Sequence, residues 1–517
     1  SWWSANPFLS GVHWTSGIEL GVRLTSWAWV RRLLHDWGKV EDLFDTNEDA
    51  LRQIWWHQHF LAAFRSLGSS ANNHVVAEAC GRLVAACAFP WYAESEAWRD
   101  DAARQLQREL RANTFESGVN RELATDYHRF VTELGLVAAA EASAAGHSLD
   151  TSTWTLLTAA VDAAAAMVDA TGRPPRQGDG DEGRALVLDD PEAEPWGLLL
   201  GLGAALVGPR PWWPTRPGSV AATALGALLP MRAPHVDRPA TAPRVFADAG
   251  MSLLRTPLDD GPEIWCRCDG GPHGFLSIAA HAHADALAVE VRHGGVDVLV
   301  DPGTYCYHGE PQWRSYFRST LAHNTIEIDG VNQSVEGGPF LWSTHTTSRV
   351  ARTEVGDLPT QAWAAHHTGY ARLDPALRHE RTVTLDRGAR QLSIVDVVTG
   401  GTEHTLRLAF HLGPEVTARL SGSVATLSWP SHTGGDAGEV HADLHLPGRL
   451  RWTAHRGETD PVLGWYSPRF GERVPTTTLV GAGAFDGSLA LRTILLFPVA
   501  QVPGVAAGMG GGRGFPT

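Results

Sequence analysis

The hydrophobic pattern of the chain changes character near residue 240. From 17 to 229, apolar residues recur at three- and four-residue spacing, which is the period of amphipathic helices. Asn47, Asp49 and Thr151 are candidate N-caps of these helices. The predicted helices cover residues 17–36, 49–66, 73–88, 94–113, 121–144 and 151–169. Because no strand pattern interrupts them, this half is predicted to be an α/α toroid or solenoid.

The second half of the chain has the two-residue period of strands. It follows a proline-rich segment at 230–244, and its short apolar segments alternate with turn signals, as in an antiparallel β-sandwich. The predicted strands cover residues 251–256, 263–269, 276–291, 296–300, 325–328, 381–385, 392–398, 406–411 and 492–498. A chain of 517 residues exceeds one hydrophobic core. We therefore predict a multidomain α+β protein, with a helical domain over 1–232, a linker over 233–244 and a β-sandwich domain over 245–517.

Composition excludes several classes of function. No apolar run reaches the roughly 20 residues of a membrane span. A formal net charge of −15 and a single lysine, Lys39, provide no basic footprint for nucleic acid. The scarcity of lysine also argues against Schiff-base chemistry. The chain begins at Ser1 without Met, so a removed signal segment would make the protein secreted or periplasmic, and an intact N-terminus would make it cytoplasmic.

Histidines and carboxylates gather between residues 281 and 325. His281, His283 and Asp285 alternate along a predicted extended segment, so their side chains should point to one face. The apolar runs 286–291 and 296–300 flank a His-Gly-Gly turn and predict a β-hairpin. Its second strand would return Asp301 toward the first, so this region is interpreted as a site.

The residue types in this region are those that bind a borderline divalent metal such as zinc. We predict that His283, Asp301 and His323 bind zinc, which leaves His281 free for chemistry. Two plainer interpretations stand beside this one. The two histidines could form a hydrogen-bonded or exposed pair, and Asp301 could accept from turn amides ahead of Pro-Gly.

At this point the sequence resembles the heparinase II/III-like polysaccharide lyases. In the second half the resemblance rests on HAHADALAVE (281–290), LVDPGTYCY (299–307) and FRSTLAHNTIEIDG (317–330). In the first half it rests on NPFLSGVHWTSGIELGVRLTSW (6–27), SSANNHVVAEA (69–79) and DYHRF (126–130). It implies an incomplete (α/α) toroid followed by an antiparallel β-sandwich domain, with the active site in a cleft between them. It also implies a metal with a mainly structural role.

The same resemblance implies the catalytic residues. Carried over by motif, Asn73 and His74 would neutralise a uronate carboxylate, while Tyr127 and His281 would serve as acid and base. A tyrosine needs its pKa of about 10 lowered to act as a base, but it needs no help to act as an acid. Without the resemblance, Tyr127 would be interpreted as an interface tyrosine, and an asparagine at 72 or 73 as an N-cap.

Further residues are candidates for binding substrate. Arg314 and Arg318 lie four residues apart, and with Tyr305 we predict that they hold an acidic sugar by bidentate pairing and stacking. The alternative is a solvated face in which the arginines pair with acids such as Glu310. Asp181 and Arg184, in GDGDEGR (178–184), resemble an acidic loop of the family and could border the cleft.

The predicted function is therefore a lyase that cleaves a uronic-acid-containing polysaccharide by β-elimination and leaves a 4,5-unsaturated uronate. Zinc is the expected cofactor and an acidic polysaccharide the expected partner. The negative net charge favours a less sulfated polymer, because long-range repulsion would slow the approach of a highly sulfated one. The alternatives are a zinc-dependent glycan hydrolase that does not need Tyr127, and a non-catalytic glycan-binding relative. The sequence does not predict an oligomeric state.

Overall fold

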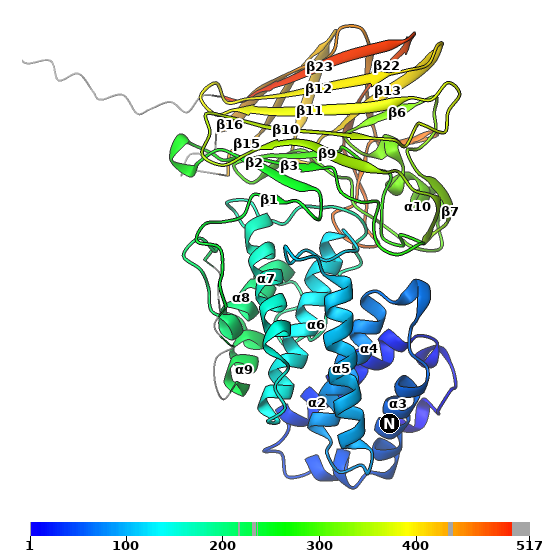
Figure 1. Ribbon diagram of the computed structural model, residues 1–517, viewed down its shortest axis with the longest axis vertical. Coiled ribbons are helices and arrows are strands. Elements are labelled where there is room, and N and C mark those ends of the chain that lie inside the picture. The colour runs from blue at the N-terminus through cyan, green and yellow to red at the C-terminus, as the bar shows by residue number, and fades with distance from the viewer. Residues whose placement is uncertain (1, 216–217, 230–233, 235, 433–437, 499–517) are drawn as a thin grey trace, which may run out of the picture.

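The computed structural model describes residues 2–215, 218–229, 234, 236–432 and 438–498. Helices occupy the first half of the chain and strands the second, and Figure 1 shows the two halves one above the other. The predicted order of a helical part followed by an antiparallel β part is confirmed. Within the predicted linker, residues 233 and 235 lie outside the described ranges. None of the described helices is long and apolar enough to cross a bilayer.

The helical half agrees with the periodicity of the sequence. Its helices are α1 (Trp2–Ala5), α2 (Gly17–Leu33), α3 (Glu48–Ala63), α4 (Asn73–Ala88), α5 (Ser95–Asn113), α6 (Thr125–Ala144), α7 (Thr151–Met167), α8 (Pro195–Val207) and α9 (Val220–Leu228). Six of these match the predicted helices. The sequence analysis did not predict α1, α8 and α9. Of these, α8 is apolar on all sides and has no 3.6-residue contrast.

Local capping residues explain where several helices begin. The side chain of Asn47 accepts from the backbone of Asp49 and Ala50 at the start of α3, as predicted. The predicted cap Thr151 is wrong, because Asp150 accepts from the Thr153 N–H at 2.7 Å and Thr151 is already helical. Asp49 is likewise inside its helix rather than its cap.

Close helix packing in the core depends on small residues. A Cβ at Gly81 of α4 would lie 2.1 Å from the carbonyl oxygen of Gly21 in α2, so the two backbones touch. From Tyr127 to Ser143, α6 is buried, and its alanine-rich half allows neighbouring helices to approach it. This central helix begins at the boundary with the β half, and it carries Tyr127 in its first turn.

The β half contains three main antiparallel sheets. The first pairs β1 (Val245–Phe246), β2 (Met251–Arg255), β3 (Ile264–Asp269), β4 (Val289–His293) and β5 (Val296–Leu299) in sequence order. The second contains, in spatial order, β14 (Thr417–Ser421), β15 (Val424–Pro430), β16 (Glu439–His445), β23 (Ser488–Leu496), β12 (Gln391–Thr399), β11 (Arg378–Asp386), β10 (Thr360–His367) and β9 (Ser348–Glu354). The third contains β17 (Arg451–Arg456), β22 (Thr477–Phe485), β13 (His404–His411) and β6 (Ile326–Ile328).

Shorter elements fill the edges of this half. The small strand pairs are β7 (Val335–Gly338) with β8 (Leu341–Thr344), β18 (Glu458–Thr459) with β19 (Val462–Leu463), and β20 (Trp465–Tyr466) with β21 (Val474–Pro475). One further helix, α10 (Pro311–Arg318), lies in the β half. The sequence analysis did not predict α10.

The predicted strand at 276–291 is largely wrong. Only β4, from Val289, is extended, and residues 276–288 form turns and loop. Positive φ angles at Leu276, Ala279 and Leu287 (59°, 46° and 62°) break the extended conformation. His281 and His283 therefore lie on a loop, and neither His281 nor Asp285 belongs to the group of His283, Asp301 and His323 whose spacing could hold a metal. The hairpin of β4 and β5 is confirmed, with His293 opposite Val296 across Gly294 and Gly295.

Candidate active site

A cavity of about 580 Å³ lies where the helical half meets the β half. The four residues predicted to be catalytic all line it, although they come from three separate parts of the chain. Asn73 and His74 begin α4, Tyr127 lies in the first turn of α6, and His281 is on the loop before β4. The structure therefore brings these four side chains to one cavity.

The ring of Tyr127 stacks on the ring of His281. Their centroids are 3.8 Å apart, with 21° between the planes. The Tyr127 hydroxyl donates to Asp181 Oδ2 at 3.1 Å and lies 2.8 Å from the hydroxyl of Tyr307. Burial, together with the neighbouring Tyr307 and Asp181, raises the pKa of Tyr127 well above its usual value. In this environment the phenol keeps its proton at neutral pH.

Asp179 connects the two histidines of the loop. Its Oδ2 lies 3.2 Å from His281 Nδ1, and its Oδ1 lies 3.0 Å from His283 Nε2. Arg314 forms a bidentate ion pair with the same carboxylate, with one Nη2–Oδ2 distance of 2.7 Å. Burial alone would raise the pKa of Asp179, but Arg314 and the two histidines lower it well below its usual range. Asp179 is therefore a buried carboxylate ion that orients both imidazoles.

The loop after α7 places Asp179 between the two halves of the molecule. Gly178 has a φ of +66°, and a Cβ there would lie 2.8 Å from the carbonyl oxygen of His281. The Asp179 N–H donates to that same oxygen at 3.0 Å, and the Gly180 N–H donates to Thr304 Oγ1 at 2.8 Å. Glycine is thus required for a close approach that holds the loop against the β half.

Glu122 is a further carboxyl group beside the predicted catalytic residues. The amide of Asn73 donates to both of its oxygens, at 3.2 and 3.0 Å. The Asn73 N–H donates to it as well, at 3.1 Å, while Asn72 caps α4 by accepting from the His74 N–H. Glu122 Oε2 also lies 3.6 Å from His281 Nε2. Burial raises the pKa of Glu122 above its usual value, although His281 and the hydrogen bonds from Asn73 oppose the shift.

Sequence reasoning missed Asp179, Glu122 and Tyr307. Weak signals exist for all three: Asp179 lies in GDGDEGR near Asp181, Glu122 precedes Tyr127 by five residues, and Tyr307 ends the motif LVDPGTYCY (299–307). The partners of these residues are distant in the chain, so their roles could not be deduced from local spacing.

The three residues predicted to bind substrate do not line the cavity. The guanidinium of Arg314 is occupied by Asp179 and by the carbonyl oxygen of Pro339. Arg318 is fully buried and donates to the carbonyl oxygen of Gly338. The Tyr305 hydroxyl donates to the side chain of Glu310. In the structure Arg314 and Tyr305 are already paired with carboxylates, whereas Arg318 is buried with its Nε and Nη2 unpaired, so none of the three presents its polar group to the cavity. Asp181 and Arg184, in contrast, do border the cavity.

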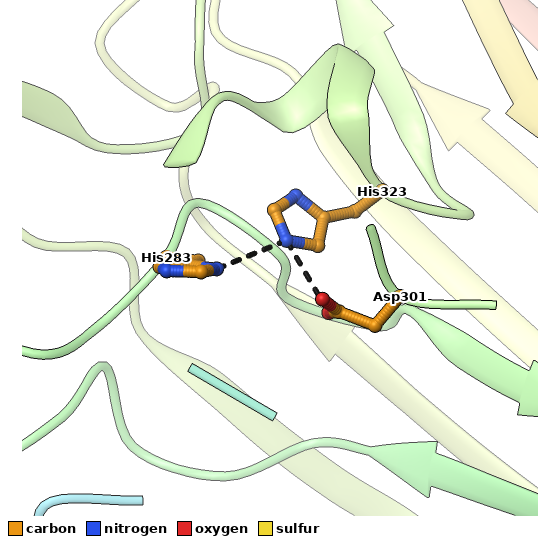
Figure 2. Close-up of side chains that lie close together, drawn as sticks. All are labelled: His283, Asp301 and His323. Atoms are coloured by element: carbon orange, nitrogen blue, oxygen red, sulfur yellow. Dashed lines mark hydrogen bonds and ion pairs between the residues drawn. The ribbon is translucent and has the colours of Figure 1, made fainter. Parts of the chain in front are cut away.

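His283, Asp301 and His323 form the one group in the described part of the chain whose spacing could hold a metal ion. One ligand atom from each lies within 4.8 Å of the others (Figure 2). His283 Nδ1 is 3.2 Å from His323 Nε2, which is 3.4 Å from Asp301 Oδ2. The Asp301 Oδ2 atom is buried and has no hydrogen-bond partner, as expected for an atom that faces a cation.

In all three residues, the side-chain nitrogen or oxygen that faces away from the shared centre has a hydrogen-bond partner. His323 Nδ1 lies 2.7 Å from the Ser319 carbonyl oxygen, and Asp301 Oδ1 accepts from the Gly303 N–H at 2.9 Å. Burial lowers the pKa of His283 and of His323, so both imidazoles are neutral, which is the form that binds metal. Burial raises the pKa of Asp301 to about 8, a cost that a cation would remove. The donor set therefore fits zinc.

The segments that carry these residues are held together by Asn324. Its amide donates to the carbonyl oxygens of Val289 in β4, at 2.8 Å, and of Val300 after β5, at 3.1 Å. Because Asn324 follows His323 and Val300 precedes Asp301, this one amide fixes the spacing between two of the three residues.

Comparison of the sequence with protein families identifies the fold and class. The family described as "Heparinase II/III-like, C-terminal" matches residues 238–492, and "Heparinase II/III N-terminus" matches residues 28–170. The chain belongs to the heparinase II/III-like family. The protein is accordingly a polysaccharide lyase, as the sequence resemblance implied. A comparison with curated protein sequences gave no match.

Solved structures share the fold of this heparinase II/III-like protein. "Heparinase III" superposes with a TM-score of 0.69 and 15% identity, over 96% of this chain and 72% of that one. "Heparinase III-BT4657 gene product" gives 0.64 and 18% identity, over 93% and 68%. Heparan sulfate lyase HepC from Pedobacter heparinus gives 0.63 and 16%, over 97% and 71%. At these identities the likeness shows the fold alone, and it confirms a helical toroid followed by a β-sandwich.

Proposed function

We propose that this protein cleaves a uronic-acid-containing polysaccharide by β-elimination and leaves a 4,5-unsaturated uronate at the new end. The observation that carries the proposal is the stack of Tyr127 on His281 in a cavity that Asn73 and His74 also line. A proton acceptor, a proton donor and neutral hydrogen-bond donors are the three groups that this reaction needs. The related structures, heparinase III and heparan sulfate lyase, support a glycosaminoglycan-type substrate.

Removal of the C5 proton places negative charge on the adjacent uronate carboxyl group. Hydrogen bonds to that group stabilise the charge as it develops. In the proposed mechanism His74 supplies one such bond, and Asn73 supplies another by turning one amide N–H from Glu122 to the substrate. Burial, followed by the nearby His281, lowers the pKa of His74, so it acts as a neutral donor. Glu122 holds the Asn73 amide from behind, which makes Glu122 a positioning residue.

His281 is the proposed base. Its Nδ1 donates to Asp179 and its Nε2 remains available to accept the C5 proton, as in other imidazoles that a buried carboxylate orients. Tyr127 is the proposed acid, because its environment keeps the phenol protonated, and it would donate to the glycosidic oxygen as the C4–O bond breaks. In this assignment His281 receives the C5 proton, and Tyr127 supplies the proton to the leaving oxygen.

The metal would be zinc held by His283, Asp301 and His323. When bound, it neutralises Asp301 and links the loop before β4 to the segments around β5 and β6. His283 also contacts Asp179, the carboxylate that orients His281. The metal therefore supports the base through two side chains, and elimination itself requires no activated water.

The test is a panel of uronate polysaccharides, incubated with the protein with and without added zinc. We expect new ultraviolet absorbance from the C4–C5 double bond, at a rate equal to the appearance of new chain ends. Reducing ends that appear without this absorbance would overturn elimination and favour the zinc-dependent hydrolase. A protein that binds a polymer but cuts none of the panel would favour the non-catalytic alternative.

A further inference from the structure

The charged side chains around the cavity favour a weakly charged sugar. Among the described residues that line it, Arg184 is the single arginine and no lysine occurs. Two carboxylates, Glu19 and Asp181, line the same space, and both are exposed. The permanent charges at the cavity therefore sum to a negative value before any substrate enters.

The arginines beside the cavity are not free to bind a sulfate in it. Arg184 Nη2 donates to the carbonyl oxygens of Pro191 and Ala193, at 3.3 and 3.0 Å. Arg314 does not line the cavity and is paired with Asp179, and its release would leave two buried charges without partners, which is strongly unfavourable. Arg318 is fully buried outside the cavity lining, where its Nη1 donates to the Gly338 carbonyl oxygen while its Nε and Nη2 have no hydrogen-bond partner.

A sulfated sugar would bring charges that this site does not balance. A uronate has one carboxylate, which the proposed function places against Asn73 and His74. Each sulfate group adds a charge that does not titrate near neutral pH, and burial of such a charge without a cation is strongly unfavourable. Burial keeps His74 neutral. This end of the cavity can therefore hydrogen-bond to one uronate carboxylate, but it supplies no positive charge for a sulfate.

Apolar side chains form one part of the remaining wall: Ile18, Val22, Phe130, Ile278 and Phe340. This part suits the C–H face of a pyranose or the methyl of an acetyl group. Ser69, Ser70, Asn72 and Tyr307 line another part, and these uncharged polar groups suit sugar hydroxyls and supply no positive charge for a sulfate. Building on the proposed function, we infer that the cavity accepts uronate polymers whose sugars next to the scissile bond carry hydroxyl or acetyl groups and no sulfate.

The first experiment compares backbone-matched pairs of polymers. Each pair consists of an unsulfated uronate polymer, such as chondroitin, and the same polymer after chemical sulfation. The readout is kcat/KM from the absorbance of the unsaturated uronate. We expect the unsulfated member to be cleaved at least tenfold more efficiently. The preference should persist at about 1 M salt, where the Debye length is about 3 Å and long-range repulsion by the net negative charge is screened.

The second experiment changes the charge of the cavity. Glu19→Lys adds a cation at the cavity, and the expected result is a preference for the unsulfated polymer that is at least threefold smaller. Glu48→Lys is the matched control, because Glu48 is exposed on α3 outside the cavity and the substitution changes the net charge equally. It should leave the preference unchanged.

The outcomes separate the two proposals. Equal or faster elimination of the sulfated polymers by the unaltered protein would overturn the inference and leave the proposed function standing. Equal effects of Glu19→Lys and Glu48→Lys would also overturn it, because they would assign the preference to net charge. Chain cleavage without the double bond would overturn the proposed function. Failure to cleave either member of any pair would contradict the proposed function, and the inference with it.

Discussion

Tyr127 and His281 belong to different halves of the molecule, yet their rings stack at a centroid distance of 3.8 Å. Tyr127 comes from the start of α6, and His281 comes from a loop of the β half. The proposed acid and base are therefore in place only when the two halves are docked. The loop that carries Asp179 and Gly180 contributes to this docking, because it hydrogen-bonds to His281 and to Thr304.

Tyr127→Phe should abolish most of the activity without unfolding the protein. The substitution keeps the ring stacked on His281 and removes only the hydroxyl, so we expect kcat to fall at least about 100-fold with little change in KM or melting temperature. Tyr92→Phe is the control, because its hydroxyl donates to the Leu51 carbonyl oxygen far from the cavity. Retained turnover in Tyr127→Phe would contradict the proposed mechanism.

Asp179→Asn should impair catalysis beyond its effect on stability. The amide keeps the shape of the side chain but loses the charge that pairs with Arg314 and orients His281. We expect kcat to fall by about 10- to 100-fold. The free energy of unfolding should fall by about 3–5 kcal/mol.

Asp297→Asn provides the matched comparison for Asp179. Asp297 is also a buried carboxylate, paired with Arg292 at 2.6 Å, and it does not line the cavity. This variant should lose comparable stability while it keeps its turnover at temperatures where it stays folded. If the two variants lose kcat to the same degree, Asp179 has only a structural role.

Removal of the metal should affect stability more than chemistry. We expect about one zinc per chain by elemental analysis, and its loss in His323→Ala and Asp301→Asn. Chelation should lower the melting temperature, because neutral histidines and a buried carboxyl group would lose their shared partner. His367→Asn is the control, since His367 belongs to a buried group with His379 and Asp396 whose hydrogen bonds are paired internally. A chelated protein with an unchanged melting temperature but no turnover would contradict a structural role.

Stability should fall as the pH drops below about 6.5, partly because of His128. Its Nδ1 accepts from the Asn120 N–H and its Nε2 faces the Ala160 carbonyl oxygen, so the folded state needs the neutral ring. Burial lowers the pKa of His128 to about 4. As the pH falls, the unfolded chain binds a proton at this histidine before the folded protein does. The contribution of His128 to the free energy of unfolding is therefore complete above the unfolded pKa and is lost as the pH falls toward 4. At pH 4 this one group has lowered the free energy of unfolding by about 3 kcal/mol.

The measurement for His128 is the melting temperature between pH 7 and pH 4, in the unaltered protein and in His128→Gln. A glutamine can replace both hydrogen bonds but does not titrate, so the variant should lose less stability over this range. Other buried histidines, among them His57, His293 and His411, have pKa values lowered in the same direction and add to the slope. Identical slopes in the two proteins would contradict the role of His128.

The sequence by itself determined the elements and the local part of the site. A 3.6-residue period located six helices, and a two-residue period around His-Gly-Gly located the hairpin that returns Asp301 toward the loop of His283. These features depend on neighbours within a few residues, and the hydrophobic pattern records such neighbours directly. The motifs also identified Asn73, Tyr127 and His281, which the structure places at one cavity.

Only the tertiary structure decided how these residues are supported. Asp179 binds His281, His283 and Arg314, all of which lie more than 100 residues away in the chain, and Glu122 meets Asn73 by the same kind of long-range packing. Arg314, which the sequence analysis predicted to bind substrate, is instead paired with Asp179. Local periodicity cannot encode which of many charged side chains meet, because burial selects the pairs only once the two halves pack together and exclude water.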